Sequence, residues 1–230
     1  MSYDGILLVD KPLGWSSFDV VAKTRGLLRD EYLKSNGEKR KVKVGHTGTL
    51  DPQATGLMIL VVGEYCKRAG DFSKLDKTYE VSMILGQGSS TGDSEGEITK
   101  GSDIEVDKHT LTGVLNSFLG ESLQTPPIYS AIKINGQRAY KLARDGKDVK
   151  LEPRKITIYD IKLTDYSYPN LNFTVSVSSG TYIRSLAEDI AKKLGTLGHL
   201  TGLRRTVVGQ FMINDSVSIE DINSTCIIKV

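Results

Sequence analysis

The sequence predicts an α+β fold in which a mixed, mostly antiparallel central sheet is flanked by helices. Strand-like runs occur both as neighbouring pairs, as in hairpins, and as single runs separated by helical patterns, which is typical of this class. The 230 residues are 39% hydrophobic, enough for the core of one large domain or two small ones. We expect a single domain over residues 1–230.

Periodic patterns place the individual elements. An apolar run at 5–10 ends at a Pro/Gly turn, after which Ser16 or Ser17 can cap a helix that runs to about Leu33. Strands are expected at 5–10, 41–44, 57–62, 78–85, 130–134, 154–166, 171–177 and 207–213. Helices are expected at 17–33, 64–73, 107–118, 137–145 and 181–194.

Two stretches lack these patterns and are expected to be loops. Residues 86–101 are acidic and rich in Gly, Ser and Thr, whereas residues 124–152 start with prolines, are basic and contain an Asn-Gly turn signal. The glycines Gly86, Gly88 and Gly92 do not have the spacing of a nucleotide-binding loop, so we reject that function.

The basic residues are clustered although the net charge is small. Lys+Arg number 30 and Asp+Glu 28, so the formal net charge is only +2. Clusters lie at 39–43, 133–150 and 204–205. A local positive field can steer a polyanion, but any one cluster can equally be a solvated face.

The composition predicts a soluble cytoplasmic protein without metal. The two cysteines, Cys66 and Cys226, lie far apart and form no metal-ligand spacing with the three histidines. No apolar run reaches membrane-spanning length, and the N-terminus has no signal-peptide pattern. We therefore expect no disulfide, no zinc and no membrane partner.

The stretch richest in side chains that could take part in catalysis is the loop 45–56, between two strand-like runs. It contains three glycines, a proline, one acid, one imidazole and three hydroxyls. Flanking elements can hold such a loop rigidly, which is how many sites are built. Pro52 restricts the backbone of Asp51 to extended angles and so fixes the direction of its carboxylate. An Asp that merely opens a turn before a proline is the alternative interpretation.

This loop resembles the signature G-H-x-G-x-L-D-P-x-A-x-G of the bacterial tRNA pseudouridine synthase B (TruB) family at every signature position. Six more blocks resemble family motifs in family order, at 10–17, 63–67, 77–81, 125–140, 180–186 and 198–206. The resemblance implies the pseudouridine synthase catalytic fold and an isomerase acting on the uridine at position 55 in the T loop of tRNA. It also implies that residues 124–152 form a mobile segment that folds over the RNA.

Pseudouridine formation needs no cofactor, because the glycosidic bond breaks, the base rotates and the same atoms rejoin through carbon. The resemblance makes Asp51 the nucleophile, since a carboxylate can add covalently or stabilise a developing cation. It places Arg184 against Asp51, where an arginine typically lowers an Asp pKa by about 1–3 units; Arg184 could instead reach solvent. Tyr79 would stack on the flipped uracil or accept its proton, although a core tyrosine fits the residues alone.

The remaining site residues come from the same motifs. His46 is implied to take the place of the flipped base, although it could bond within its own loop. Leu203 resembles the leucine that packs on the base, and Tyr182, which we assign to substrate binding, could be only structural. Phosphate or pocket-wall contacts are expected from Lys11, Lys67, Arg204 and Arg205.

Two departures from the family pattern matter. Ser90 stands where the family's motif at 86–96 has an acid that helps to hold the essential arginine. Either Asp93 compensates or Arg184 is held less firmly, so we expect a slower enzyme. The chain also ends soon after the catalytic domain. We therefore expect no C-terminal RNA-binding PUA domain, and a monomer whose tRNA binding depends more on the T arm.

Two other functions fit the sequence: an RNA chaperone that refolds tRNA without turnover, and the catalytic subunit of a guide-RNA-dependent pseudouridylation complex. Retention of Asp51, Tyr79 and Arg184 favours the enzyme, because a pure binder has no use for a buried acid. Activity on bare tRNA without guide RNA would separate the enzyme from the complex subunit.

Overall fold

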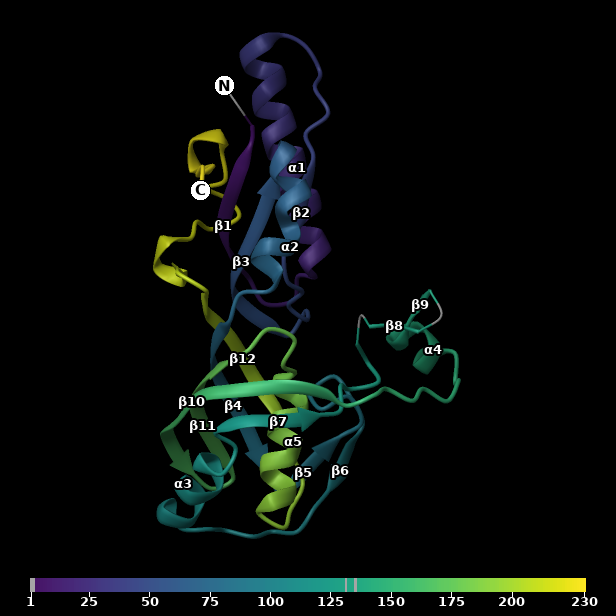
Figure 1. Ribbon diagram of the computed structural model, residues 1–230, viewed down its shortest axis with the longest axis vertical. Helices are drawn as coiled ribbons and strands as arrows, with labels where there is room; N and C mark the ends of the chain where they lie inside the picture. Colours follow the sequence, from purple (N-terminus) through teal and green to yellow (C-terminus); the bar gives the residue numbers. More distant parts are fainter. Residues whose placement is uncertain (1–2, 131, 135) are drawn as a thin grey trace. The chain divides into compact units, whose positions relative to one another are not determined.

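A computed structural model describes residues 3–130, 132–134 and 136–230. The described residues form two compact units. Unit 1 joins the described part of Met1–Tyr79 to Leu203–Val230, and unit 2 is the described part of Glu80–Gly202. The division falls within two strands, β4 (Lys77–Leu85) and β12 (Gly198–Val208), so each has residues in both units. Figure 1 labels these strands. The predicted α+β class with a mostly antiparallel sheet is confirmed, whereas the single domain stays a prediction.

Unit 1 is built around β3 (Ala54–Val62). This strand pairs antiparallel with β1 (Gly5–Lys11) and with β2 (Val44–His46), and parallel with the second half of β12. A short strand, β13 (Phe211–Met212), pairs with the end of β12. The two apolar runs at the start of the chain therefore become neighbouring strands, and the loop 47–53 enters the sheet at the start of β3.

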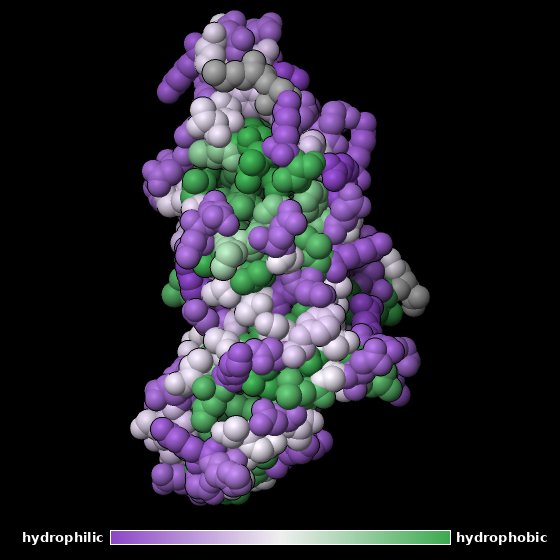
Figure 2. Space-filling view, turned by 60° about the vertical axis from the view of Figure 1, so that its left-hand side comes forward, coloured by the Kyte–Doolittle hydropathy of each residue, from purple (hydrophilic) through white to green (hydrophobic). Residues whose placement is uncertain are grey.

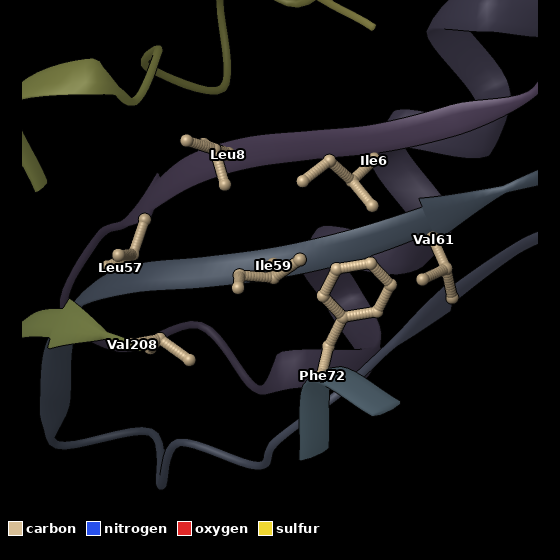
Figure 3. Packing of buried hydrophobic residues seen from close by; sticks show 7 residues of the cluster. All are labelled: Ile6, Leu8, Leu57, Ile59, Val61, Phe72 and Val208. Atoms are coloured by element: carbon tan, nitrogen blue, oxygen red, sulfur yellow. The ribbon is translucent and has the colours of Figure 1, made fainter. Parts of the chain in front are cut away.

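Alternating apolar residues of β1 and β3 form the core of unit 1. Successive side chains of a strand point to opposite faces, so every second residue joins the same cluster. Figure 3 shows this cluster, which also includes an aromatic ring from the helix α2 (Ala69–Ser73). Its members are Ile6, Leu8, Leu57, Ile59, Val61, Phe72 and Val208.

The long helix of unit 1, α1 (Ser17–Asn36), begins as the sequence predicts. Ser16 is its N-cap and forms a capping box with Asp19, and Gly37 ends the helix in the left-handed conformation. The predicted helix 64–73 is instead divided into the 3-10 helix η1 (Gly63–Arg68) and α2. Two more 3-10 turns, η2 (Ile213–Asp215) and η3 (Ser224–Cys226), follow β13.

Unit 2 consists of antiparallel strands with helices packed against them. A long hairpin joins β10 (Arg154–Ser167) to β11 (Asn170–Val177), and β7 (Gly120–Gln124) pairs with the other edge of β10. The helix α3 (Lys108–Asn116) packs against β10 and against α5 (Ile183–Lys193). One face of α5 is buried at helical spacing, as expected for an amphipathic helix on a sheet.

The prediction of a loop at 86–101 is wrong in part. Two short strands, β5 (Gln87–Ser89) and β6 (Ile98–Lys100), pair antiparallel inside it. Each strand has only three residues and one has a glycine, so the periodic pattern is too short to detect. The backbone of Ser90 and Glu97 closes the hairpin, with a hydrogen bond from Ser90 N to Glu97 O of 3.0 Å.

The segment 124–152 contains little regular structure among its described residues. It holds the two-residue strands β8 (Lys133–Ile134) and β9 (Gln137–Arg138), and the helix α4 (Ala139–Arg144). Of the strand expected at 130–134, only the last two residues form a strand, β8. The helix expected at 137–145 is nearly as predicted. Two motif positions in this segment, Ala131 and Asn135, lie outside the described residues.

The strand β12 starts much earlier than the expected strand at 207–213. Its first residues mix glycine, histidine and threonine, which weakens the strand pattern. Packing decides the outcome, because a Cβ at Gly198 would lie 2.7 Å from the Cβ of Ala191 and 2.9 Å from the Cε of Met83. The strand lies so close to its neighbours in unit 2 that only glycine fits there.

The visible surface mixes hydrophilic and hydrophobic residues (Figure 2). Single large apolar side chains such as Leu13, Phe18 and Leu123 are exposed, which is ordinary for a protein surface. Among the described residues, no helix combines the length and the apolar character needed to cross a bilayer.

The parallel pairing of β3 with β12 makes a testable demand on Gly56. Its φ is +104°, and a Cβ there would lie 2.3 Å from the carbonyl oxygen of Arg205. We expect Gly56→Ala to lower the free energy of unfolding of unit 1 by at least about 2 kcal/mol. Urea unfolding followed by the fluorescence of Trp15, the single tryptophan, reports this change.

The matched control is Gly26→Ala within α1, where no atom lies within 4 Å of the added Cβ. This change should raise the free energy of unfolding by about 0.5–1 kcal/mol, because alanine favours a helix over glycine. Equal stability of the two variants would contradict the proposed close contact at Gly56.

Candidate active site

The loop that carries Asp51 is fastened to the start of α1 through one hydroxyl. The Oγ of Ser17 accepts a hydrogen bond from Leu50 N and donates one to Leu50 O, both at 2.8 Å. On the other side, Ala54 N donates to Asp51 O at 3.0 Å. Asp51 itself is half-buried. Its backbone therefore has little freedom, and the carboxylate points from a fixed position.

The side chain of Lys11 binds the same loop from below the surface. It has no exposed area, and its Nζ donates to the carbonyl oxygens of Trp15 at 2.6 Å, Pro12 at 2.9 Å and Pro52 at 3.3 Å. Burial lowers the pKa of Lys11 to about 8, an effect that the carboxylate of Asp51 partly opposes. The ammonium is thus a buried positive charge close enough to Asp51 to interact with it electrostatically.

A second buried cation, Arg205, holds both ends of the loop. Its side chain is 2% exposed, its Nε donates to Leu57 O at 2.7 Å, and its Nη2 donates to Gly48 O at 3.3 Å. The register of β3 and β12 places Arg205 opposite Gly56. The missing side chain at Gly56 is what allows this approach.

Arg204 points to a different partner. Its Nη2 and Nη1 bind the two carboxylate oxygens of Asp10 at 2.7 and 3.1 Å, and Nη1 lies 3.4 Å from the hydroxyl of Thr55. Such two-pronged pairing of a guanidinium with a carboxylate fixes both groups. About a third of each side chain stays exposed, so this pair forms part of the surface beside the loop.

Four more predicted residues lie in unit 1. His46 is half-buried at the end of β2, with its backbone opposite Leu60. Tyr79 on β4 is 6% exposed, and Leu203 pairs with Ala54 next to the loop. Lys67 is exposed on η1 and forms an ion pair with Glu64.

Arg184 lies in unit 2, in the first turn of α5, and its guanidinium is held by backbone oxygens. Nη1 donates to Thr91 O at 2.9 Å and Nη2 to Tyr129 O at 2.8 Å. Its Nε lies 3.8 Å from Oδ2 of Asp93, with both side chains about nine-tenths buried. A buried charge needs such partners, so the alternative of an arginine that simply reaches solvent is excluded.

The hairpin at 86–101, where Ser90 replaces the acid of the family motif, contributes to holding Arg184. The Oγ of Ser90 accepts from Glu97 N at 2.9 Å and so faces its own hairpin. Asp93 supplies the carboxylate beside Arg184, and its Oδ1 accepts from the Thr91 hydroxyl at 2.5 Å. The expected alternative in which Asp93 compensates for Ser90 fits this geometry, whereas its effect on rate stays a prediction.

A buried amide that sequence reasoning missed sets the start of α5. Gln124, at the end of β7, donates from Nε2 to Tyr182 O at 3.0 Å and accepts at Oε1 from Tyr182 N at 2.8 Å. The Oγ of Ser185 donates to Thr125 O at 3.2 Å. Tyr182 is therefore fixed through its backbone. Nothing in the local sequence marks Gln124, because both of its hydrogen bonds are with a residue 58 positions away.

The structure changes the interpretation of two predicted phosphate ligands. The sequence predicts Lys11 and Arg205 at a phosphate or a pocket wall, but both side chains are buried and bind carbonyl oxygens of the loop and its flanks. A buried cation that donates to carbonyls cannot also bind a phosphate in solvent. Ser17, which the sequence indicates only as a possible helix cap, binds the residue before Asp51.

Comparison with known proteins identifies the family. The model of the "TruB family pseudouridylate synthase (N terminal domain)" matches residues 35–183, and that of the "tRNA pseudouridylate synthase B C-terminal domain" matches residues 184–229. Two curated relatives are the tRNA pseudouridine synthases B of Dechloromonas aromatica and Burkholderia lata, each 43% identical. The alignments cover 96% and 94% of this chain and 70% and 64% of the relatives.

Solved structures agree with this result. A chain in the crystal structure of a Cbf5-Nop10-Gar1 complex matches with a TM-score of 0.68 and 26% identity, over 95% of this chain and 53% of that chain. A chain in an H/ACA RNP bound to a substrate RNA containing 2'-deoxyuridine matches with a TM-score of 0.64 and 25% identity. That alignment covers 94% of this chain and 51% of the other.

The fold and the motif loop thus define a pseudouridine synthase. More specifically, the chain belongs to the TruB family of pseudouridylate synthases. Family membership confirms the expected enzyme class, an isomerase that converts uridine in tRNA to pseudouridine.

The buried ammonium of Lys11 makes stability depend on pH in a defined direction. The pKa of Lys11 is about 8 in the folded protein and about 10.5 in the unfolded chain. Between these values the unfolded chain binds more protons, so the contribution of Lys11 to the free energy of unfolding rises with pH. The gain across this window is at most about 3 kcal/mol.

The variant Lys11→Met removes this titration and nearly preserves the shape of the side chain. We expect the stability of the wild type relative to Lys11→Met to increase between pH 8 and 10.5, measured by urea unfolding. Lys77, whose pKa is also lowered to about 8 by burial, is present in both proteins and cancels. Parallel pH profiles would show that Lys11 does not titrate in this window.

Proposed function

We propose that this enzyme isomerises the uridine at position 55 of the T loop, with Asp51 as the nucleophile. The observation that carries the proposal is the rigid mounting of Asp51. Both backbone groups of Leu50, the residue before it, form hydrogen bonds with the hydroxyl of Ser17. The backbone oxygen of Pro52, the residue after it, accepts a hydrogen bond from Lys11. A nucleophile held in one position avoids the entropy cost of orienting it in each turnover.

The chemistry asks for one carboxylate and no cofactor. The bond between C1′ of the ribose and N1 of the uracil breaks, the base rotates, a bond between C1′ and C5 forms, C5 loses its proton and N1 takes one up. A carboxylate can form a covalent link during this sequence or stabilise the cationic sugar. Asp51 must stay ionised while it is partly removed from water, which costs free energy unless positive charge is near. The ammonium of Lys11 supplies such a charge within unit 1.

Arg184 supplies the second positive charge in the proposal. Its guanidinium is fixed by hydrogen bonds to the backbone oxygens of Thr91 and Tyr129. The pairing of Arg184 with Asp51, implied by the family motif, remains a prediction. Tyr129 belongs to the segment 124–152, so the proposed closure of this segment over RNA would act directly on Arg184.

The other motif residues take supporting roles. Tyr79, nearly buried on β4, would stack on the flipped uracil, a contact worth about 1–3 kcal/mol. His46 would fill the vacated position in the RNA stack. Lys67 and the pair of Arg204 with Asp10 are the exposed groups available to phosphate or to the pocket wall. We expect the enzyme to act in the cytoplasm as a monomer.

The decisive test is release of tritium from C5-labelled uridine in unmodified tRNA. We expect release by the wild type and a loss of at least about a thousandfold in Asp51→Asn, with tRNA affinity changed less than about threefold. The matched control is Asp71→Asn, which removes an exposed carboxylate in the same unit and should keep wild-type rates.

Each other outcome has a clear meaning. Full activity of Asp51→Asn would exclude Asp51 as the nucleophile. Tight tRNA binding without release by the wild type would favour the RNA chaperone. Release only after guide RNA and further proteins are added would favour the subunit of a guide-RNA-dependent complex, an alternative that the structural match to an H/ACA RNP keeps relevant.

A second prediction concerns Asp93 as the carboxylate beside Arg184. Asp93→Asn keeps the shape and one acceptor oxygen but removes the charge 3.8 Å from Nε of Arg184. We expect kcat to fall about tenfold with KM changed less than about threefold, because the change affects orientation rather than RNA binding. Asp160→Asn, at an exposed ion pair with Lys162, is the control. A change in KM alone would contradict this role.

A further inference from the structure

A groove lined by positive charges lies beside α1 in unit 1, and none of its lining residues is among those assigned to catalysis. Figure 1 shows α1 and the chain that returns from it side by side. Between them is a hollow of about 510 Å³, here called the basic groove. Its lining residues are Ala22, Arg25, Gly26, Arg29, Lys39, Arg40, Lys41 and Val42.

The shape of the basic groove follows from the sequence of α1. Ala22, Arg25, Gly26 and Arg29 have helical spacing and share one face. Ala22 and Gly26 have almost no side chain, so they leave a hollow between the two arginines. A Cβ built on Gly26 meets no atom within 4 Å, which confirms open space above the helix at this point.

The opposite wall presents charge because of an alternating pattern. Val42 and Val44 are buried, whereas Lys41 and Lys43 are exposed. Such alternation is typical of an extended chain with one face on the core. The valines anchor the segment, and the lysines are directed to solvent.

The positive charge of this region exceeds that of the whole protein. Residues 22–44 contain eight basic and three acidic side chains, a formal charge of +5. Since the whole chain carries +2, all remaining residues together sum to −3. Only one of the three acids pairs with a lining cation, Asp30 with Arg29, whereas Glu38 contacts Tyr32 and Glu31 contacts Ser224.

Four of the five cations that line the basic groove have no carboxylate partner in the part of the chain that the structure describes, the exception being Arg29. Lys39 and Lys41 form no ion pair there, and Arg25 donates only to a backbone oxygen, Val44 O, at 3.2 Å. Arg40 lies over the ring of Tyr32, with its guanidinium carbon 5.4 Å from the ring centroid. A concave surface with unneutralised cations from two sides is suited to a ligand with several negative charges.

We propose that the basic groove binds backbone phosphates of the substrate RNA, at a place separate from the flipped nucleotide. The inference rests on the proposed function for the identity of the RNA. Lys41 is five residues from His46, so the two lie at most about 18 Å apart. One RNA can therefore reach both. Contacts of this kind position an RNA and add salt-dependent affinity without reading its sequence.

The sharpest test adds a negative charge to the basic groove and leaves every basic residue in place. Gly26→Glu places a carboxylate in the open space of the basic groove, and Gly26→Gln is its neutral match. Both replace a helical glycine, so both should fold at least as well as the wild type. We expect Gly26→Glu to weaken binding of unmodified tRNA at least about fivefold relative to Gly26→Gln at about 0.1 M salt, with the difference shrinking at about 0.5 M.

Removing the cations gives an independent measurement. The double variant Lys39→Gln with Lys41→Gln should reduce the slope of log affinity against log salt by about one for each phosphate that the groove no longer binds. KM for tRNA should rise while kcat at saturating tRNA stays within about twofold. An unchanged slope and equal affinity of the two Gly26 variants would overturn the proposal.

The same assays separate this inference from the proposed function. If the wild type released tritium and the basic-groove variants bound tRNA as the wild type does, the proposed function would be supported and the role of the groove in RNA binding would be rejected. A small-anion site would differ again. If inorganic phosphate at millimolar concentration bound the wild type more tightly than Gly26→Glu, with tRNA affinity equal for both, the groove would serve free phosphate and not RNA.

Discussion

The loop that carries Asp51 is held by two cations that are buried inside unit 1 and donate to backbone oxygens. Lys11 binds the carbonyl after Asp51, and Arg205 binds Gly48 and Leu57 on either side of the loop. A glycine-rich loop leaves carbonyl groups without sheet partners, and buried carbonyls need donors. Charged donors make stronger hydrogen bonds than neutral ones. The position of Asp51 therefore depends on side chains that need never touch the substrate.

This constraint also accounts for the local arrangement of strands. Arg205 can reach the loop from inside only because β12 runs parallel to β3 and places it opposite Gly56. Any side chain at Gly56 would collide with the backbone of Arg205. Gly56, at the end of the signature, and Arg205, about 150 residues later in the sequence, are thus structurally interdependent. The neighbouring Arg204 faces the surface and pairs with Asp10 instead.

Much of the fold could be predicted from the sequence, because the apolar runs that form β1, β3 and β4 are long and regular. The start of β12 could not, since its residues become strand through packing of Gly198 against Ala191 and Met83. The motifs predict the positions of the site residues, but not their contacts. A lysine or arginine in a sequence normally indicates exposed charge. The burial of Lys11 and Arg205 is decided by carbonyl groups brought together only in the folded chain.

The departure at Ser90 can be understood from the same type of interaction. Arg184 is held chiefly by the carbonyl oxygens of Thr91 and Tyr129, so its orientation depends on where the backbone of the β5–β6 hairpin runs. Ser90 fixes that backbone by accepting a hydrogen bond from Glu97 N. A serine at this position can therefore serve Arg184 indirectly, while Asp93 provides the negative charge. In each unit, then, backbone oxygens hold motif cations, Lys11 and Arg205 in unit 1 and Arg184 in unit 2, so a substitution that keeps those oxygens in place should keep the cation in place.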